Sequence, residues 1–167
     1  DSYVLQSTVD EMSVSIRDEL MLKALILTEE QAEKYGDLLE EADTSRFSYT
    51  VDAYEKDCDE RAREAADTFR YDNTGFTAHI TLEEDNLVFF SVPYEEGWTA
   101  TVNGEPVEVE KVQIGFMAVE ASAGENVIQF YYETPGLRVG IMISLGAALA
   151  LAAYWIGSTV YIRRHRG

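Results

Sequence analysis

The feature that most constrains this chain is a stretch of 24 residues without a charged side chain, from Val139 to Ile162. Arg138 precedes the stretch and Arg163 follows it. As a helix it would be about 36 Å long, against a hydrocarbon layer of roughly 30 Å. The helix of a buried soluble core is seldom so long and so free of charge. The sequence therefore predicts a transmembrane helix over residues 138–162 and a basic tail over residues 163–167.

The flanks of the span predict its orientation. Arg163, Arg164 and Arg166 follow it closely, and positive residues stay on the cytoplasmic side, so residues 1–137 are expected outside the membrane. Small residues recur at every fourth position and would let another helix approach closely: Gly140, Ser144, Ala148 and Ala152. An alanine-rich span also produces such spacing by chance. The expected partners are the lipid bilayer and other transmembrane helices of the same polypeptide.

Charge divides the chain as sharply as hydropathy does. The 167 residues include 31 acidic and 13 basic side chains, a formal net charge of -18. All the acidic residues and ten of the basic ones precede Val139, so residues 1–138 carry -21 and the tail carries +3. Such a surface argues against a nucleic-acid partner, because phosphate contact needs clustered Lys and Arg. A hydrophobic content of 46% excludes a disordered acidic tail.

The beginning of the chain shows no export signal. It starts at Asp1, and neither a basic nor an apolar signal segment follows. An exported domain must be led across the membrane, so we expect either a removed signal or earlier spans of a longer polypeptide. The single Cys58 cannot form an internal disulfide, and the domain must depend on its core.

The first part of the expected ectodomain, residues 1–74, predicts a mixture of helices and strands. Apolar spacing in the first twenty residues favours one or two short helices, and residues 22–27 predict a short buried strand. Thr28 and Gln31 have the spacing of a capping box, which predicts a helix that begins at Thr28 and ends near Asp43.

The remainder of this part predicts one strand and one helix. Phe47, Tyr49 and Val51 alternate with polar residues, as a half-buried strand would. Small residues from Cys58 to Ala66, closed by the aromatic Phe69, fall at helical spacing and predict a buried helix face. The nearby acidic residues Asp57, Asp59 and Glu60 lack the ligand spacing of a calcium loop and are expected to be solvated.

From Gly75 the hydrophobic period switches to two, and residues 75–137 predict the β part of the ectodomain. Asn103-Gly104 between alternating runs is a strong hairpin signal, and His79 falls on the polar face of a strand. After Gly75 the sequence predicts no helix that could connect two parallel strands, so the strands are expected to be antiparallel. The predicted fold class is therefore mainly β (α+β): an antiparallel β-sandwich-like ectodomain with flanking helices, followed by one C-terminal transmembrane helix.

Chemistry-bearing motifs are scarce. The sequence contains no phosphate-binding glycine loop, no Cys/His cluster and no nucleophile elbow. It therefore predicts no catalytic residue and no metal-binding residue. Pro93 and Gly97 bracket a loop that carries two large amphipathic side chains, Tyr94 and Trp98. These rings either stack on a sugar at the edge of the sandwich or, in the case of Trp98, cover the end of the core.

Several motifs in order carry a resemblance to a known family. They are Phe89 to Trp98, Val102-Asn103-Gly104, Gly115 to Val119, and Pro135-Gly136-Leu137 before a closing hydrophobic span. Together they resemble the C-terminal end of the YfhO family of bacterial polytopic membrane proteins. The resemblance is specific over residues 76–145 and looser over residues 17–70.

The resemblance implies a GT-C-type glycosyltransferase of the bacterial cell membrane. The donor would be a sugar on a polyprenyl phosphate, and the acceptor lipoteichoic acid or another cell-envelope polymer. The catalytic acid of such enzymes lies in an early outer loop, and no position of this chain matches it. The fragment itself is therefore expected to be non-catalytic.

Three roles follow for the chain. It is the C-terminal ectodomain and last span of such a transferase, a glycan-binding module, or an assembly domain whose small-residue stripe packs the final helix. The charge of -21 opposes direct binding of a polyanionic teichoic acid unless cations bridge the two.

Overall fold

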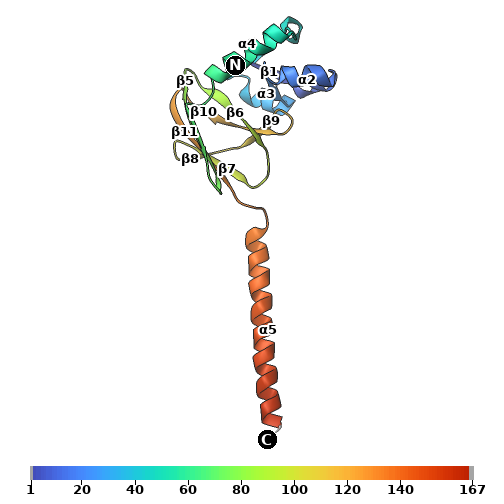
Figure 1. The fold of residues 1–167 in the computed structure, drawn as a ribbon, viewed down its shortest axis with the longest axis vertical. Helices are drawn as coiled ribbons and strands as arrows, with labels where there is room; N and C mark the ends of the chain where they lie inside the picture. The colour runs from blue at the N-terminus through green and yellow to red at the C-terminus, as the bar shows by residue number, and fades with distance from the viewer. Residues whose placement is uncertain (1, 166–167) are drawn as a thin grey trace. The chain divides into compact units, whose positions relative to one another are not determined.

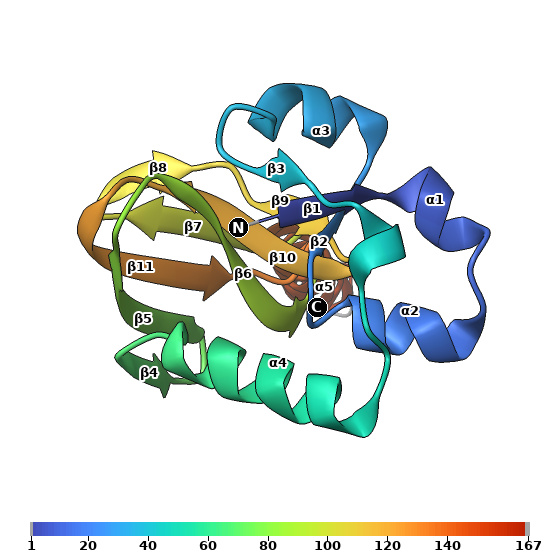
Figure 2. The same cartoon turned by 90° about the horizontal axis from the view of Figure 1, so that it is seen from above.

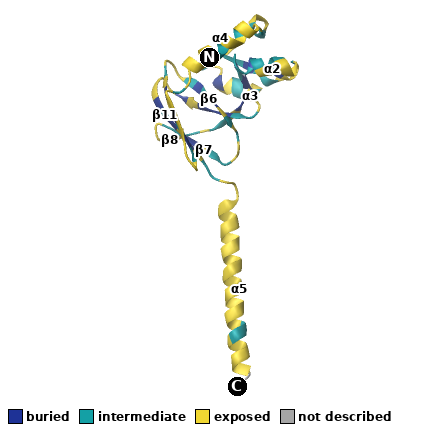
Figure 3. Ribbon diagram, in the orientation of Figure 1, coloured by how far each residue is buried: buried dark blue, intermediate teal, exposed yellow. Residues whose placement is uncertain are grey.

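The computed structural model describes residues 2–165, and the chain divides into two compact units, Asp1–Tyr132 and Glu133–Gly167. The second unit contains one long helix, α5 (Leu137–His165), drawn in orange to red in Figure 1. Its side chains are exposed almost throughout, as Figure 3 shows. The mean hydropathy of α5 reaches 2.0 over 18 residues, so by length and composition it can cross a membrane.

The first unit combines short helices with many short strands. Along the chain its elements are β1 (Ser2–Leu5), α1 (Gln6–Asp10), α2 (Val14–Leu20), β2 (Leu25–Leu27), α3 (Glu29–Tyr35), β3 (Glu40–Glu41), a 3-10 turn (Thr44–Arg46), α4 (Val51–Arg63), β4 (Thr68–Tyr71), β5 (Gly75–Leu82), β6 (Asn86–Pro93), β7 (Trp98–Val102), β8 (Glu105–Val107), β9 (Glu110–Val112), β10 (Phe116–Ala121) and β11 (Gly124–Tyr132).

Two antiparallel sheets form the sandwich that the sequence predicts. One has five strands in the order β4-β5-β11-β7-β8, and the other has three in the order β6-β10-β9. Alternate residues of both sheets meet in a shared core, where Ala78, Met117 and Ile128 are fully buried. Period-two alternation after Gly75 thus predicts the fold class correctly, because each strand has one face on this core.

The hairpin at Asn103-Gly104 is also confirmed. Both residues have positive φ, 55° and 88°, as a type I′ turn requires. The turn is tied to β11, because the Asn103 side-chain oxygen accepts from the Val127 N–H at 2.8 Å. Its amide nitrogen donates to Asn126 Oδ1 at 3.0 Å, and Asn126 is buried.

The N-terminal segment contains the predicted short helices and the predicted buried strand, here β2, but the third layer that they form is not predicted. β1 pairs in parallel with both β2 and β3, and helices α1, α2 and α3 lie in the connections between these strands. This small sheet packs on the outer face of the β6-β10-β9 sheet through a second core that includes Leu27, Leu87 and Ala118. The β6-β10-β9 sheet is therefore covered on part of its outer face as well, where Leu87 and Ala118 are buried, while Phe89 on the same face is 37% exposed. Figure 2 shows α1 and α2 on the side away from β8 and β11.

The capping box of α3 is confirmed, but the predicted end of the helix is wrong. The Thr28 hydroxyl accepts from the Gln31 N–H at 3.2 Å, and the Gln31 side chain accepts from the Thr28 N–H at 3.1 Å. The helix ends at Tyr35 because Gly36 follows, and glycine is a poor helix former. Leu39 follows Tyr35 at helical spacing but is buried by the turn after the helix, so apolar spacing continues beyond the end of the helix itself.

The predicted strand at Phe47–Val51 and the predicted buried helix face are both wrong. Thr50 caps α4 instead, accepting from the Ala53 N–H at 3.3 Å. Helix α4 has no buried residue, Cys58 is only half-buried, and Phe69 lies 50% exposed in β4. Small residues with helical spacing do not mark a core face here, because polar side chains hold this helix in place.

Candidate functional site

The loop that carries Tyr94 and Trp98 lies at one end of the sandwich core. The Tyr94 N–H donates to the Gly115 carbonyl at 2.9 Å, and both side chains are partly buried against the core. The Trp98 ring centroid lies 5.6 Å from that of Phe76 and 5.0 Å from that of Tyr132. These contacts are those of an aromatic cluster that closes the core. Sugar stacking by the two residues stays a prediction.

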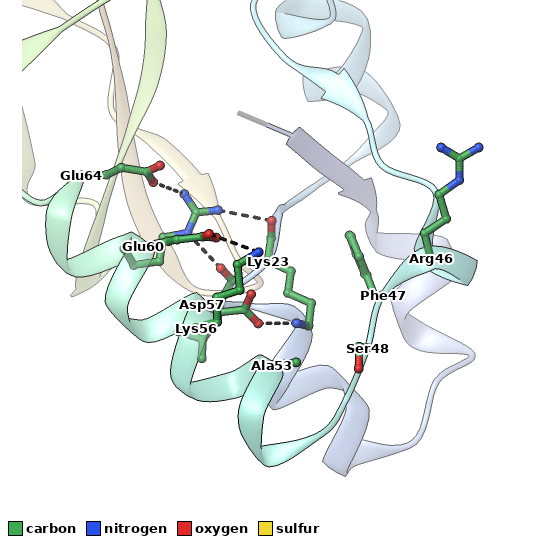
Figure 4. A pocket seen from close by; sticks show the side chains of 11 residues that line it. Lys23, Arg46, Phe47, Ser48, Ala53, Lys56, Asp57, Glu60 and Glu64 are labelled. Atoms are coloured by element: carbon green, nitrogen blue, oxygen red, sulfur yellow. Dashed lines mark hydrogen bonds and ion pairs between the residues drawn. The ribbon is translucent and has the colours of Figure 1, made fainter.

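A cavity of about 440 Å³ lies between α4 and the loop before β2. Figure 4 shows that acidic and basic side chains alternate around it. Lys56 pairs with Glu60 at 3.4 Å, and Arg61 pairs with Glu64 at 2.9 Å. The fourth basic residue of the lining, Arg46, pairs with Asp43 at 3.0 Å, so every cation around the cavity has an acidic partner and the cavity lacks the unpaired positive charge of an anion site.

Lys23 is the central cation of that cavity. Its side chain is 8% exposed and forms an ion pair with Asp57. The ammonium nitrogen also lies 6.0 Å from the Phe47 ring centroid and 5.8 Å from the Tyr49 ring centroid. Arg61 adds a bond to the Leu22 carbonyl at 2.9 Å. These contacts attach α4 to the N-terminal layer and explain how a helix without buried residues is held.

A second polar cluster joins α3 to β9. Glu110 accepts hydrogen bonds from Lys34 at 2.6 Å, from Tyr35 at 2.8 Å and from Gln31 at 2.9 Å. Burial alone would raise the pKa of Glu110, but these three donors outweigh burial and lower its pKa. Burial raises the pKa of Tyr35 to about 12. The cluster holds its carboxylate ionised, which suits a structural joint between two layers.

Sequence reasoning missed a buried glutamine. Gln113 lies in the turn between β9 and β10 and is 2% exposed, and its side chain bonds to three backbone groups of the N-terminal layer. No local motif marks it, because a single Gln between apolar residues reads as an ordinary turn residue. Its unusual backbone, with φ of 50°, is visible only in the structure.

The other sequence-predicted residues occupy ordinary positions. His79 is exposed on β5. The stripe Gly140, Ser144, Ala148 and Ala152 lies along α5, where each residue is exposed. Across residues 2–165, no group of three or more His, Cys, Asp or Glu side chains is arranged to hold a metal ion.

Comparison with known proteins identifies the family of this chain. A family model described as "Bacterial membrane protein YfhO" matches residues 42–144, which run from the end of the N-terminal layer through both sandwich sheets into α5. The chain belongs to the YfhO family. It is 31% identical over 93 residues to "Uncharacterized protein YfhO" of Bacillus subtilis (strain 168).

The extent of that second match limits what it describes. It covers 56% of this chain but 11% of the YfhO protein of Bacillus subtilis, so the chain corresponds to a small part of that relative. No solved structure matches the chain. The family consists of bacterial membrane proteins, and α5 is long and apolar enough to cross a membrane. We therefore assign the chain to a membrane protein of the YfhO family.

Proposed function

We propose that the chain is the extracytoplasmic C-terminal domain and last span of a polytopic glycosyltransferase. The enzyme would transfer a sugar from a polyprenyl phosphate to lipoteichoic acid or another cell-envelope polymer. One observation carries the proposal: the family match continues without a break from the sandwich into α5. Glycosyltransferase activity itself is what the resemblance to the family implies.

In this proposal the chain supports the chemistry and does not perform it. The folded unit shapes the acceptor side of the active site, and α5 packs against earlier spans through its small residues. The charge of -21 before Val139 would repel a polyanionic acceptor, which favours a positioning role over tight binding. The basic end of α5, with Arg163 and Arg164, favours a cytoplasmic tail.

Cysteine labelling tests the proposed orientation. In a full-length protein cleared of other cysteines, Ser122→Cys places a thiol on an exposed turn of the first unit, and a second variant, His165→Cys, places one at the basic end of α5. A membrane-impermeant maleimide added to intact cells should label the first and not the second. The reverse pattern would place the folded unit in the cytoplasm and end the proposal.

Sugar transfer is tested with the full-length protein in lipid vesicles. Radiolabelled polyprenyl-phosphate hexoses and lipoteichoic acid are supplied, and transfer of label to the polymer is the expected result. If no polyprenyl-phosphate hexose serves as a donor under conditions that keep the protein folded, the transferase assignment is wrong.

The stacking prediction for Tyr94 and Trp98 is tested in the same assay. Tyr94→Ala and the conservative Trp98→Phe should raise the KM for acceptor without lowering thermal stability if the rings contact a sugar. A lower Tm with an unchanged KM would instead assign both side chains to the core.

A further inference from the structure

The five-stranded sheet turns one face to the core and presents the other outward. Pairing across its strands aligns Arg70, Thr77, Gln129 and Thr101 in one row, from β4 through β5 and β11 to β7. Thr99 and Tyr131 form the next pair along the same face. We call these six residues the threonine face. Helix α2 lies on the opposite side of the sandwich in Figure 1, and Figure 2 shows both α1 and α2 on that side.

The threonine face is accessible and hollowed. Thr99 and Gln129 are exposed, and Tyr131 is 53% exposed. A depression of about 320 Å³ lies over the middle of the face, lined in part by Thr77, Thr101 and Gln129. The face therefore offers polar side chains from several strands around one shallow site.

The charge of this face sets it apart from the rest of the unit. None of its six residues is acidic, although 31 of the 167 residues of the chain are. At the rim, Asp72 is already engaged, since its carboxylate accepts from the Thr74 N–H at 2.6 Å and from the Gly75 N–H at 3.0 Å. Arg70 is the single cation of the face. One positive charge is too few for a polyanion, and the hydroxyl and amide groups are too polar for an apolar protein interface.

We propose that the threonine face binds a neutral glycan, a chain of uncharged hexoses. Threonine hydroxyls and the glutamine amide both donate and accept, which matches the paired donor and acceptor character of sugar hydroxyls. Thr99 already donates to the Tyr131 carbonyl at 3.2 Å, which leaves the lone pairs of its oxygen for a sugar donor. The exposed Tyr131 ring supplies an amphipathic surface for the C–H face of a pyranose.

This inference goes beyond the proposed function, because binding by the sheet requires neither a sugar donor nor turnover. The test uses the whole chain in detergent micelles and isothermal titration calorimetry. The probes are maltohexaose, cellohexaose and the hexamer of N-acetylglucosamine, with poly(glycerol phosphate) as the polyanionic comparison. Saturable binding of at least one neutral hexamer is expected, with weaker or no binding of the polyanion.

Two variants locate the site. Tyr131→Ala should weaken binding by about fivefold to tenfold, the size expected for one aromatic contact. Gln129→Glu places a carboxylate in the middle of the face and should weaken binding by a similar factor. The matched control is Tyr54→Ala in α4, since Tyr54 is 47% exposed and lies off the sheet. Circular dichroism confirms that each variant is folded.

Three results would overturn the inference: no saturable binding of any neutral hexamer, binding that Tyr131→Ala and Gln129→Glu leave unchanged, or tighter binding of poly(glycerol phosphate) than of the hexamers. Because no donor is present, the outcome is independent of whether the full-length protein transfers sugar. Loss of transferase activity with intact hexamer binding would refute the proposed function alone.

Discussion

Gln113 is bonded to Ile26 through both its backbone and its side chain. The Gln113 N–H donates to the Ile26 carbonyl at 3.0 Å, and the Ile26 N–H donates to Gln113 Oε1 at 2.8 Å. The amide nitrogen of the same side chain donates to the Met21 carbonyl at 3.0 Å and to the Ala24 carbonyl at 3.3 Å. One residue of the sandwich thus completes the free edge of β2, where unpaired backbone groups would otherwise be buried.

Gln113→Leu should lower the free energy of unfolding by about 3 kcal/mol, because it leaves the buried Ile26 N–H without an acceptor. Gln113→Asn should also destabilise the chain, since its shorter side chain does not reach Ile26. Urea unfolding in micelles measures both. Gln129→Leu, at an exposed glutamine, is the control and should change stability by no more than about 0.5 kcal/mol. Equal losses in the Gln113 and Gln129 variants would contradict this account.

Ile114 occupies a strained backbone position. Its φ is 68°, a region that β-branched residues rarely adopt, and its side chain is 47% exposed. Ile114→Asn should raise the free energy of unfolding by about 1 kcal/mol, since Asn enters this region at lower cost. Ile114→Ala keeps the strain that any Cβ meets there and should gain less. A thermal melt in which Ala stabilises as much as Asn would show that strain is not the cause.

Gly75 is required by a close approach between strands. A Cβ at this position would lie 1.9 Å from the Phe130 carbonyl oxygen, a backbone atom that cannot move aside freely. Gly75→Ala should therefore destabilise the chain by about 3 kcal/mol. Gly115→Ala is the matched control, because nothing lies within 4 Å of its added Cβ. Denaturant midpoints compare the two, and similar midpoints would rule out the clash.

Stability should fall in acid partly through Glu110. Its pKa is lowered in the folded chain, so the unfolded chain binds the proton more tightly. The contribution of Glu110 is therefore complete above about pH 4.5 and is lost as the pH falls through the lower folded-state pKa. Unfolding measured from pH 7 to pH 3 should show a steeper loss in the wild type than in Glu110→Gln. The control is Glu108→Gln, since Glu108 pairs with Lys34 but is 73% exposed, and its unfolding should depend on pH as that of the wild type does. If stability falls equally steeply with pH in all three proteins, Glu110 does not contribute to the acid sensitivity.

The β part of the fold was predictable because its cues are local. Ala78 and Ile80 alternate with Thr77 and His79, and Asn103-Gly104 marks its own turn, so neighbouring residues carry the information. The same alternation puts Thr77, Thr99 and Thr101 on outward positions. The row that joins them to Gln129 depends on register between strands, and no local pattern records register.

The helices and the buried strand of the N-terminal layer were predictable from local spacing, but the pairing that makes them a sheet was not. β1 is four residues long, and its partners at Leu25 and Glu40 are separated from it by helices. Gln113 and Ile26 are 87 positions apart. The alternation at Phe47 and Tyr49 misleads, since both rings lie near the Lys23 ammonium and belong to no strand.

The cover that the N-terminal layer gives to part of the β6-β10-β9 sheet decides where this unit can be cut. The family match begins at residue 42, after β1, α1, α2, β2, α3 and β3. A fragment that started there would keep every strand of the sandwich but lose the cover over Leu87, Val112 and Ala118. These three apolar side chains are at most 2% exposed in the whole chain but would face water in the fragment. We expect such a fragment to aggregate. We therefore expect a stable folding unit to include residues before position 42, where the family match begins.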